Sequence, residues 1–337
     1  MATLKAASAE TVSLRTSDDD DVLGKFPFAA PSIDIVICFH NEEDTIELLF
    51  DRLRAVLREC AISWRVICVN DGSTDRTLEL LVKQHEHDSR VKIIDLSRNF
   101  GKEQALTAGL DACDADAVVC MDADLQDPPE TIKDFIQYWR QGYEVVYGVR
   151  ARRDRDTLLK RATADLFYRA FNLLSNSSIP RNVGDFRLLD RKAVIALRQL
   201  QERNRFMKGL FNWVGFSRIG VDYHREMRIA GKTKWNYWRL WNFALDGITS
   251  FTTLPLRVWV YVGVITALAA FVYASFLVVR TLILGVDVPG YASLMVAVLF
   301  MGGIQLLSLG ILGEYVGRLY NEAKGRPLYL VRHRIGF

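Results

Sequence analysis

The sequence predicts an α/β domain built on a mostly parallel, Rossmann-like sheet, followed by a two-helix transmembrane hairpin. Between residues 33 and 148, short β-branched and apolar runs alternate strictly with amphipathic stretches. That alternation is typical of a parallel sheet with helices on both faces. After Arg257, only Arg280, Asp287 and Glu314 interrupt an apolar region that extends to Val316. The chain therefore reads as a soluble half joined to a membrane half.

The elements of the soluble half follow from hydrophobic periodicity. Apolar runs rich in Val and Ile predict strands at Ile33–Phe39, Arg65–Val69, Val91–Leu96, Ala117–Met121 and Val145–Gly148. Apolar residues at helical spacing predict helices at Glu43–Leu57, Asp75–His85, Lys102–Ala112 and Pro129–Arg140. We expect Asp75 to cap its helix.

Two charge-free runs predict the membrane half. As a helix rising ~1.5 Å per residue, Val258–Val279 is about 33 Å long, enough for a hydrocarbon core of ~30 Å. Tyr291–Gly313 is a second such run. The short linker between them contains Gly285, Pro289 and Gly290, which predicts a hairpin. A hairpin buried inside a soluble protein is the alternative, and it is disfavoured because two runs of this length are difficult to hide.

Basic residues flank the hairpin on one side. They are Arg239, Arg257, Arg318, Lys324, Arg326, Arg332 and Arg334. Because Lys and Arg are retained in the cytoplasm, we expect both termini and the soluble half there. The expected organisation is a disordered tail (1–30), a catalytic domain (31–230), a juxtamembrane interfacial segment (231–257), two transmembrane helices (258–316, at about 258–280 and 291–313) and a cytoplasmic tail (317–337).

Two further segments have a membrane-related interpretation. Leu158–Leu174 is either an interfacial helix or a surface helix that faces the core. Trp235–Trp241 has three tryptophans just before the first span, where aromatic rings favour the headgroup zone. The net charge of +3 argues against a nucleic-acid partner. The five cysteines show no CxxC spacing and predict reduced thiols.

Polar loops follow four consecutive predicted strands. Ligands of such sheets bind at the carboxyl ends of the strands, so chemistry is expected in these loops. They are His40 to Glu42, Asn70 to Asp75, Ser97 to Lys102 and Asp122 to Asp127.

Asp122 and Asp124 are the most informative pair in these loops. Two carboxylates on one short turn repel each other unless they share a cation, and Mg²⁺ is commonly held by one or two carboxylates plus phosphate oxygens. A solvated acidic turn is the alternative for such a pair in isolation. Here Gln126 and Asp127 extend the polar cluster, and Asp71 is suited to accept from the imide N–H of uracil or from guanine. A nucleoside diphosphate would supply phosphate oxygens to a cation on Asp122 and Asp124, and its base would meet Asp71.

Five motifs in order carry a family resemblance. They are Ile-Val-Ile-Cys-Phe-His-Asn-Glu-Glu, Val-Asn-Asp-Gly-Ser-Thr-Asp, Leu-Ser-Arg-Asn-Phe-Gly-Lys-Glu, Met-Asp-Ala-Asp-Leu-Gln-Asp-Pro-Pro-Glu and Gly-Asp-Phe-Arg-Leu-Leu-Asp-Arg. The set resembles the family-2 inverting glycosyltransferases, in particular the polyprenyl-phosphate branch with dolichyl-phosphate mannose synthases and bactoprenol glucosyltransferases. The resemblance covers roughly Ile33 to Leu330 and implies a GT-A type fold.

The resemblance also implies roles for individual residues. The nucleotide-sugar would contact Cys38, His40, Glu42, Asp71, Lys102, Asp122 and Gln126. Mg²⁺ or Mn²⁺ would be held by Asp122, Asp124 and Gln126, and Asp124, Asp185 and Arg187 would act in catalysis. The acceptor phosphate would meet Arg205, Arg225, Arg228, Lys232 and Lys234. The family usually shows Pro and Tyr where this chain has Cys38 and His40, which puts stacking on the base in question.

The implied activity is transfer of a hexose, with UDP-glucose as the preferred donor, to undecaprenyl phosphate with inversion, at the cytoplasmic face of a bacterial plasma membrane. GDP-mannose or UDP-N-acetylglucosamine as donor, or an inactive nucleotide-sugar-binding scaffold, are the alternatives. A nucleotidyltransferase would want a Gly-rich loop after the first strand. A processive polysaccharide synthase would carry more spans and a Gln-x-x-Arg-Trp segment. Glycines suited to helix packing leave a homo-oligomer open, namely Gly302, Gly303, Gly310, Gly313 and Gly317.

Overall fold

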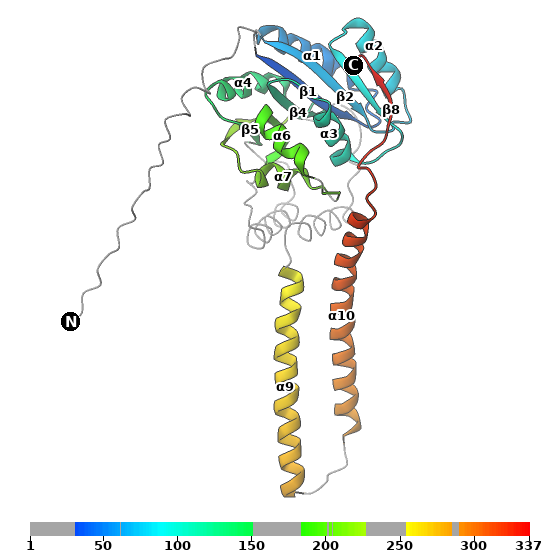
Figure 1. The fold of residues 1–337 in the computed structure, drawn as a ribbon, viewed down its shortest axis with the longest axis vertical. Helices are drawn as coiled ribbons and strands as arrows, with labels where there is room; N and C mark the ends of the chain where they lie inside the picture. Colours follow the sequence, from blue (N-terminus) through cyan, green and yellow to red (C-terminus); the bar gives the residue numbers. More distant parts are fainter. Residues whose placement is uncertain are drawn as a thin grey trace, which may run out of the picture.

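An eight-stranded sheet lies between two layers of helices in the computed structural model, and two long helices project from this domain (Figure 1). The structure describes residues 31–60, 62–150, 183–200, 202–203, 205–226, 254–284 and 290–337. The predicted tail 1–30, the helix at Leu158–Leu174 and the tryptophan segment Trp235–Trp241 lie outside these residues.

The sheet has the order β7-β5-β6-β4-β1-β2-β3-β8. Its strands are β1 (Ser32–Phe39), β2 (Ser63–Asn70), β3 (Val91–Leu96), β4 (Ala117–Asp122), β5 (Val145–Arg150), β6 (Val183–Asp190), β7 (Arg218–Tyr223) and β8 (Val331–Ile335). Pairing is parallel except that β6 runs antiparallel to β4 and β5, and β8 runs antiparallel to β3. The five predicted strands and the mostly parallel GT-A-like sheet are confirmed. The strands β6, β7 and β8 were not predicted.

Each face of the sheet buries its own apolar layer. On one face pack α1 (Ile46–Glu59), α2 (Thr77–His87), η1 (Pro129–Thr131) and α4 (Ile132–Arg140). On the other face pack α3 (Lys102–Asp111), α6 (Arg191–Gln199) and α7 (Met207–Trp213). Alternate residues of β1 serve the two layers: Ile35 and Ile37 face the first and Val36 faces the second, all fully buried. Burying such a side chain stabilises the fold by about 1.5–3 kcal/mol.

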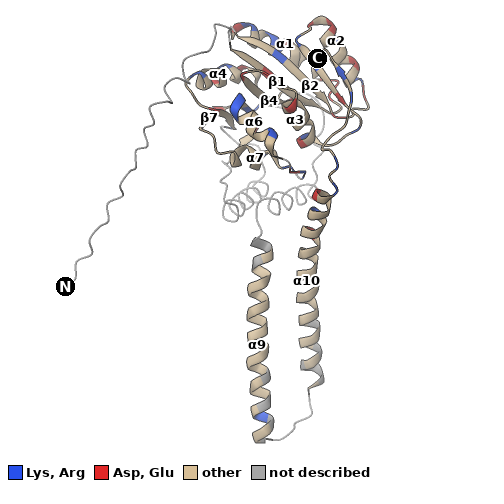
Figure 2. Cartoon of the chain, in the orientation of Figure 1, with Lys and Arg blue, Asp and Glu red and all other residues tan. Residues whose placement is uncertain are grey.

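The two C-terminal helices are long, apolar and exposed. The helix α9 (Leu254–Leu284) extends beyond the predicted run Val258–Val279 at both ends. The helix α10 (Tyr291–Ala323) extends beyond the predicted run Tyr291–Gly313 at its C-terminal end. Windows within them, Val258–Leu277 and Val296–Ala323, have mean hydropathy 2.1, and Figure 2 shows both helices almost free of charged residues. Both helices are long and apolar enough to cross a membrane. Large side chains such as Leu282, 82% exposed, favour lipid over water.

The segment 317–337, expected to be a cytoplasmic tail, contains regular structure that the sequence analysis did not predict. The helix α10 continues to Ala323, and β8 then returns to pair with β3 at the edge of the sheet. An uncovered edge strand presents unpaired N–H and C=O groups, and β8 covers that edge. The strand was not predicted because two arginines and a histidine in Val331–Ile335 resemble the charge that flanks a membrane span.

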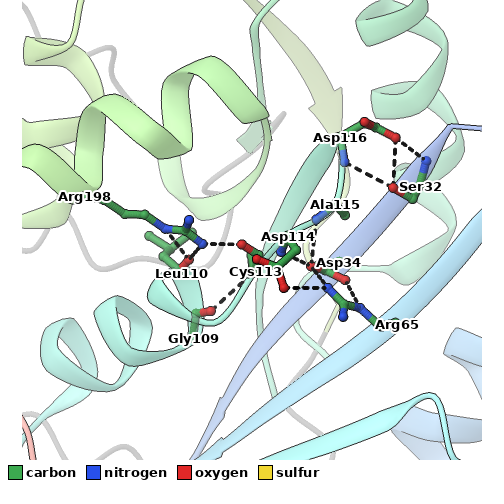
Figure 3. A network of polar contacts seen from close by, with 10 residues as sticks. All are labelled: Ser32, Asp34, Arg65, Gly109, Leu110, Cys113, Asp114, Ala115, Asp116 and Arg198. Carbon is green, nitrogen blue, oxygen red and sulfur yellow. Dashed lines mark hydrogen bonds and ion pairs between the residues drawn. The ribbon is translucent and has the colours of Figure 1, made fainter. Parts of the chain in front are cut away.

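A buried polar network fixes the amino ends of β1 and β4 (Figure 3). Asp34 has no exposed surface, and it accepts from Arg65 Nε at 2.8 Å and Nη2 at 2.7 Å. The same carboxylate accepts from the backbone N–H groups of residues 114 and 115. Because ligands bind at the carboxyl ends of parallel strands, this network is structural and the opposite edge is the functional one.

Candidate active site

Side chains from four parallel strands and one antiparallel strand converge at the carboxyl edge of the sheet. The strands β1, β2, β3 and β4 are parallel and end there. The strand β6 runs the other way, and its register with β4 pairs Arg187 with Cys120. Its first residues, including Asp185, therefore lie beside the end of β4 and Asp122. This reversal brings the late acidic motif to the earlier one.

Lys102 joins these two acidic motifs. It is the first residue of α3, and its Nζ lies 2.7 Å from Asp122 Oδ1 and 2.6 Å from Asp185 Oδ2. Burial alone would lower the pKa of the ammonium, but the two carboxylates raise it well above the ordinary value. Lys102 therefore stays charged at neutral pH and offsets the repulsion between the carboxylates.

Asp185 is ionised despite its burial. Burial would raise the pKa of this carboxyl, but Lys102 and Lys208 hold it well below its usual range. Its Oδ1 is also buried and has no hydrogen-bond donor among the described residues. Behind it, Arg187 donates to Gly184 O at 2.7 Å and lies 3.8 Å from the centre of the Phe211 ring. Burial lowers the pKa of Arg187 to about 10. These contacts hold the start of β6.

The Asp-x-Asp loop has strained backbone at its centre. Leu125, which is fully buried, has φ of 56°, a left-handed conformation that non-glycine residues rarely adopt. The backbone N–H of Gln126 donates to Asp124 Oδ1 at 3.2 Å. Strain of this kind persists only where surrounding contacts enforce it, and it is typical of ligand-binding loops.

Asp127 belongs to a second polar group next to this loop. The Tyr223 hydroxyl donates to Asp127 Oδ1 at 2.5 Å, and Arg150 Nε donates to the same hydroxyl oxygen at 3.2 Å. Burial, together with the nearby Asp122, raises the pKa of Asp127 to about 6. These contacts tie the ends of β5 and β7 to the Asp-x-Asp loop.

Asp71 organises the opposite side of the site. Its Oδ1 accepts from the N–H of Phe100 at 2.7 Å and its Oδ2 from the N–H of Gly101 at 3.0 Å. Gly72, with φ of 62°, packs directly on this loop, since a Cβ there would lie 2.4 Å from Asn99 N. The Asn-Asp-Gly-Ser motif thus docks the loop after β2 onto the loop after β3. Both carboxylate oxygens of Asp71 already accept from this loop.

His40 lies against the same pair of loops. Its Nδ1 donates to Asp71 O at 2.9 Å, which leaves Nε2 to accept from Asn99 Nδ2 at 3.0 Å. Cys38 pairs with Asp122 in the β1–β4 register, and burial raises the pKa of its thiol. Glu42 lies in the loop after β1, and its backbone N–H donates to Thr77 Oγ1 at 3.0 Å.

The predicted acceptor-phosphate residues are only partly brought together. Arg225 donates to Gln126 Oε1 at the Asp-x-Asp loop. Arg205 directs its donors to Leu200 O, Glu202 O and Thr107 Oγ1, contacts that indicate a structural role. Arg228, Lys232 and Lys234 lie outside the described residues.

Sequence reasoning missed four polar residues that the fold places around this edge. They are Asn99, Glu103, Arg150 and Tyr223. Arg150 ends the observed β5 and lies just beyond the predicted fifth strand, Val145–Gly148, and that position was the available signal for it. Glu103 accepts from the N–H of Met207 at 2.9 Å, and burial together with Asp185 raises the pKa of its carboxyl to about 7. Its place on the predicted helix Lys102–Ala112 gave no sign that its carboxyl is buried near Asp185.

Two family profiles match consecutive parts of the chain. Glycosyl transferase family 2 matches residues 34–198, and the GtrB C-terminal hairpin matches residues 254–319. An uncharacterized glycosyltransferase of Synechocystis, sll0501, is 56% identical over 89% of this chain and 94% of the relative. The prophage bactoprenol glucosyl transferase homolog of Escherichia coli is 45% identical over 89% of this chain and 98% of the relative.

The uncharacterized glycosyltransferase YkcC of Bacillus subtilis is 43% identical over 90% of this chain and 94% of that protein. The hairpin match and the two apolar helices associate the chain with a membrane. Identity at this level over nearly the whole length, together with the two profiles, settles the family. The chain is a glycosyltransferase of family 2 that carries a GtrB-type C-terminal hairpin.

Proposed function

We propose that this glycosyltransferase moves glucose from UDP-glucose to undecaprenyl phosphate with inversion, and that it does so at the cytoplasmic face of a membrane. The observation that carries the proposal is the bridge from Lys102 to Asp122 and Asp185 on a domain joined to an apolar hairpin. This geometry suits the transfer of a sugar between two phosphate-bearing molecules, one soluble and one in a lipid bilayer. The name of the Escherichia coli relative, a bactoprenol glucosyl transferase homolog, supports glucose as the sugar and a polyprenyl acceptor.

A divalent cation is part of the proposal. Asp122 and Asp124 would hold it, with Gln126 beside them on the same loop. Because no three His, Cys, Asp or Glu side chains group as metal ligands among the described residues, the other ligands would come from the substrate and from water. Two carboxylates fit Mg²⁺ or Mn²⁺, which complete their coordination with substrate phosphate oxygens and water. When bound, such an ion would stabilise the charge that develops on the leaving diphosphate.

The uridine would lie on the side of the site formed by the loops after β1, β2 and β3. The imidazole of His40 is held by Asp71 O and Asn99 and presents a fixed ring at this position. Glu42 and Cys38 line the same end of β1 in the proposal. Because Asp71 already receives two N–H donors, its proposed role is to shape this pocket as much as to contact the base.

Asp185 is proposed to orient the sugar and the acceptor. A phosphate monoester has a second pKa of about 6, so the acceptor oxygen is largely ionised at neutral pH and needs no base. That oxygen bonds to the anomeric carbon while the bond from this carbon to the diphosphate breaks, and the electron pair leaves with the nucleoside diphosphate. One displacement inverts the anomeric configuration, so an α-linked donor gives a β-linked product. Lys102 and the proposed acceptor cations, among them Arg225, offset the gathered negative charge.

The orientation in the membrane is proposed from the ends of the hairpin. Both α9 and α10 extend from the same side of the domain (Figure 1), so the domain and the nearer ends of the two helices would share one face of the membrane. Arg318, Lys324 and Arg326 follow the apolar part of α10, and basic residues are retained on the cytoplasmic side.

The test is transfer of radiolabelled sugar to undecaprenyl phosphate in detergent, with UDP-glucose, UDP-N-acetylglucosamine and GDP-mannose compared in Mg²⁺ or Mn²⁺. We expect lipid-phase label from UDP-glucose, its loss in Asp124→Asn, and normal transfer in Asp134→Asn, an exposed carboxylate on α4. Label from another donor alone would overturn the choice of glucose. Nucleotide binding without transfer from any donor would favour the scaffold alternative.

A further inference from the structure

The C-terminal strand β8 lies beside β3, the strand that leads into one of the loops on the proposed nucleotide side of the site. In the β8–β3 register, Arg334 pairs with Ile94 and His333 with Asp95, and an irregularity follows between Asp95 and Leu96. At this irregularity the Arg332 guanidinium turns toward the end of β3. It donates to Ser97 O at 2.5 Å, and its Nη1 lies 3.7 Å from Asp95 Oδ2.

Asp95 is a buried carboxylate, and the Arg332 guanidinium is a cation that lies beside it. It is 1% exposed, and its Oδ2 is buried without a hydrogen-bond donor among the described residues. Its Oδ1 accepts from Asn70 Nδ2 at 2.8 Å. A buried carboxylate is strongly disfavoured when no positive charge faces it, so the Arg332 guanidinium compensates the buried Asp95 carboxylate.

Asn70 carries the contact on to the nucleotide loops. It is the last residue of β2 and directly precedes Asp71, and its Oδ1 accepts from the N–H of Ser73 at 3.3 Å. Ser73 Oγ in turn accepts from the N–H of Asn41, next to His40, at 3.0 Å. A continuous polar chain therefore runs from Arg332 through Asp95 and Asn70 to both loops.

The second contact of Arg332 acts on the third nucleotide loop. Ser97 begins the loop whose Phe100 and Gly101 N–H groups bind Asp71. Besides the Arg332 contact at its carbonyl, Ser97 donates its N–H to Leu330 O at 2.9 Å. The C-terminal segment thus holds the start of this loop, and Asp71 holds its end.

The same segment is fastened to the last membrane helix. At the end of α10, Glu322 Oε1 accepts from the N–H of Arg203 at 2.8 Å, and Arg203 Nε donates to Arg326 O at 2.9 Å. Further on, the Tyr329 hydroxyl donates to Asp111 Oδ2 at 2.9 Å at the end of α3. The path from α10 to β8 is therefore held against the domain at several points.

We propose that Arg332 is a positioning residue for the nucleotide half of the donor site. It acts through Asp95 and Ser97 on the loops that carry Asp71 and His40, and β8 thereby joins the membrane hairpin to donor binding. The inference rests on the proposed function in taking a uridine nucleotide as the ligand of these loops. Arg332 itself touches no substrate.

The experiment measures UDP affinity by calorimetry on the full chain in detergent, with kcat and KM for UDP-glucose alongside. Arg332→Gln is compared with Arg334→Gln, which removes the same charge from the same strand but lies away from Asp95. We expect about fivefold weaker UDP binding and a similar rise in KM for Arg332→Gln with kcat within twofold, since a half-exposed ion pair contributes up to ~1 kcal/mol. Arg334→Gln should match the wild type, and Arg332→Lys should recover part of the loss.

A double-mutant cycle tests whether Arg332 affects UDP binding through Asp95. In an Asp95→Asn background, which has no buried charge to stabilise, Arg332→Gln should weaken UDP binding by less than it does alone. Equal UDP affinity in the wild type and Arg332→Gln would overturn the inference. So would equal losses in Arg332→Gln and Arg334→Gln, or a loss that Asp95→Asn leaves unchanged. A wild-type chain that binds no uridine nucleotide would instead overturn the proposed function, and the inference with it.

Discussion

Gly72→Ala is the substitution whose consequence the structure defines most sharply. The backbone at Gly72 has φ of 62°, and a Cβ there would lie 2.4 Å from both Arg98 C and Asn99 N. These contacts are backbone atoms, so no side chain can swing away to relieve them. The new methyl group must push the loop after β2 away from the loop after β3, which stretches the Asp71 bonds to Phe100 and Gly101.

The magnitude has two parts. A left-handed conformation costs a residue with a Cβ about 1–2 kcal/mol, and forcing a methyl into a close-packed contact adds ~1–3 kcal/mol. The expected loss of stability is therefore about 3 kcal/mol. For a domain of this size it corresponds to a drop in Tm of roughly 6–12 °C. UDP affinity should fall by about tenfold or more, because the loops that shape the proposed uridine pocket separate.

Gly142→Ala is the matched control in the same assay of thermal unfolding and UDP binding. Gly142 has φ of 99°, but a Cβ there would meet nothing within 4 Å. It therefore isolates the conformational part, about 1–2 kcal/mol, and should leave UDP binding unchanged. The reasoning is refuted if Gly72→Ala lowers Tm no more than Gly142→Ala does and binds UDP normally.

Three further outcomes are expected. Asp34→Ala removes the carboxylate that binds Arg65 and the backbone of residues 114–115, and should destabilise the domain by about 3 kcal/mol. Thermal unfolding measures this loss, and a loss under ~1 kcal/mol would contradict the stabilising role of the network. Lys102→Gln should lower kcat by about 10²–10³-fold. Lys83→Gln, an exposed control on α2, should keep full activity. A decrease in kcat of less than about tenfold in Lys102→Gln would exclude the bridging role. Because burial and Asp185 raise the pKa of Glu103 from 4.5 to about 7, the folded state binds the extra proton and loses stability as pH rises through this window. Glu103→Gln should therefore gain Tm relative to the wild type between about pH 5 and about pH 8, and a pH-independent difference would contradict the assignment.

The parallel half of the sheet could be predicted because its local signals agree with its tertiary environment. Strands such as Ala117–Met121 are continuous apolar runs buried on both faces, so the apolar pattern alone locates them. The polar loops that follow were predictable for the same reason, since parallel strands all end at one edge. His40, Asp71 and Asp122 needed no further information to be placed there.

The antiparallel strands could not be found in this way. Asp185 was identified only by a motif, and its contact with Lys102 depends on β6 running opposite to β4, which no local pattern encodes. Tyr223 meets Asp127 across 96 positions of sequence, and its own segment carries no comparable signal. The strand β8 was hidden by its charges, because Arg332 serves a buried carboxylate rather than solvent or a membrane surface.

The chemical structure of the lipid product decides whether the enzyme transfers glucose to a polyprenyl phosphate with inversion. Undecaprenyl phosphate incubated with the enzyme, UDP-glucose and Mg²⁺ or Mn²⁺ would be extracted and examined by mass spectrometry and by proton NMR of the anomeric position. We expect one hexose added to each lipid phosphate in the β configuration, with no product after chelation of the metal. An α-linked product, or unmodified lipid under conditions where UDP-glucose binds, would contradict this expectation.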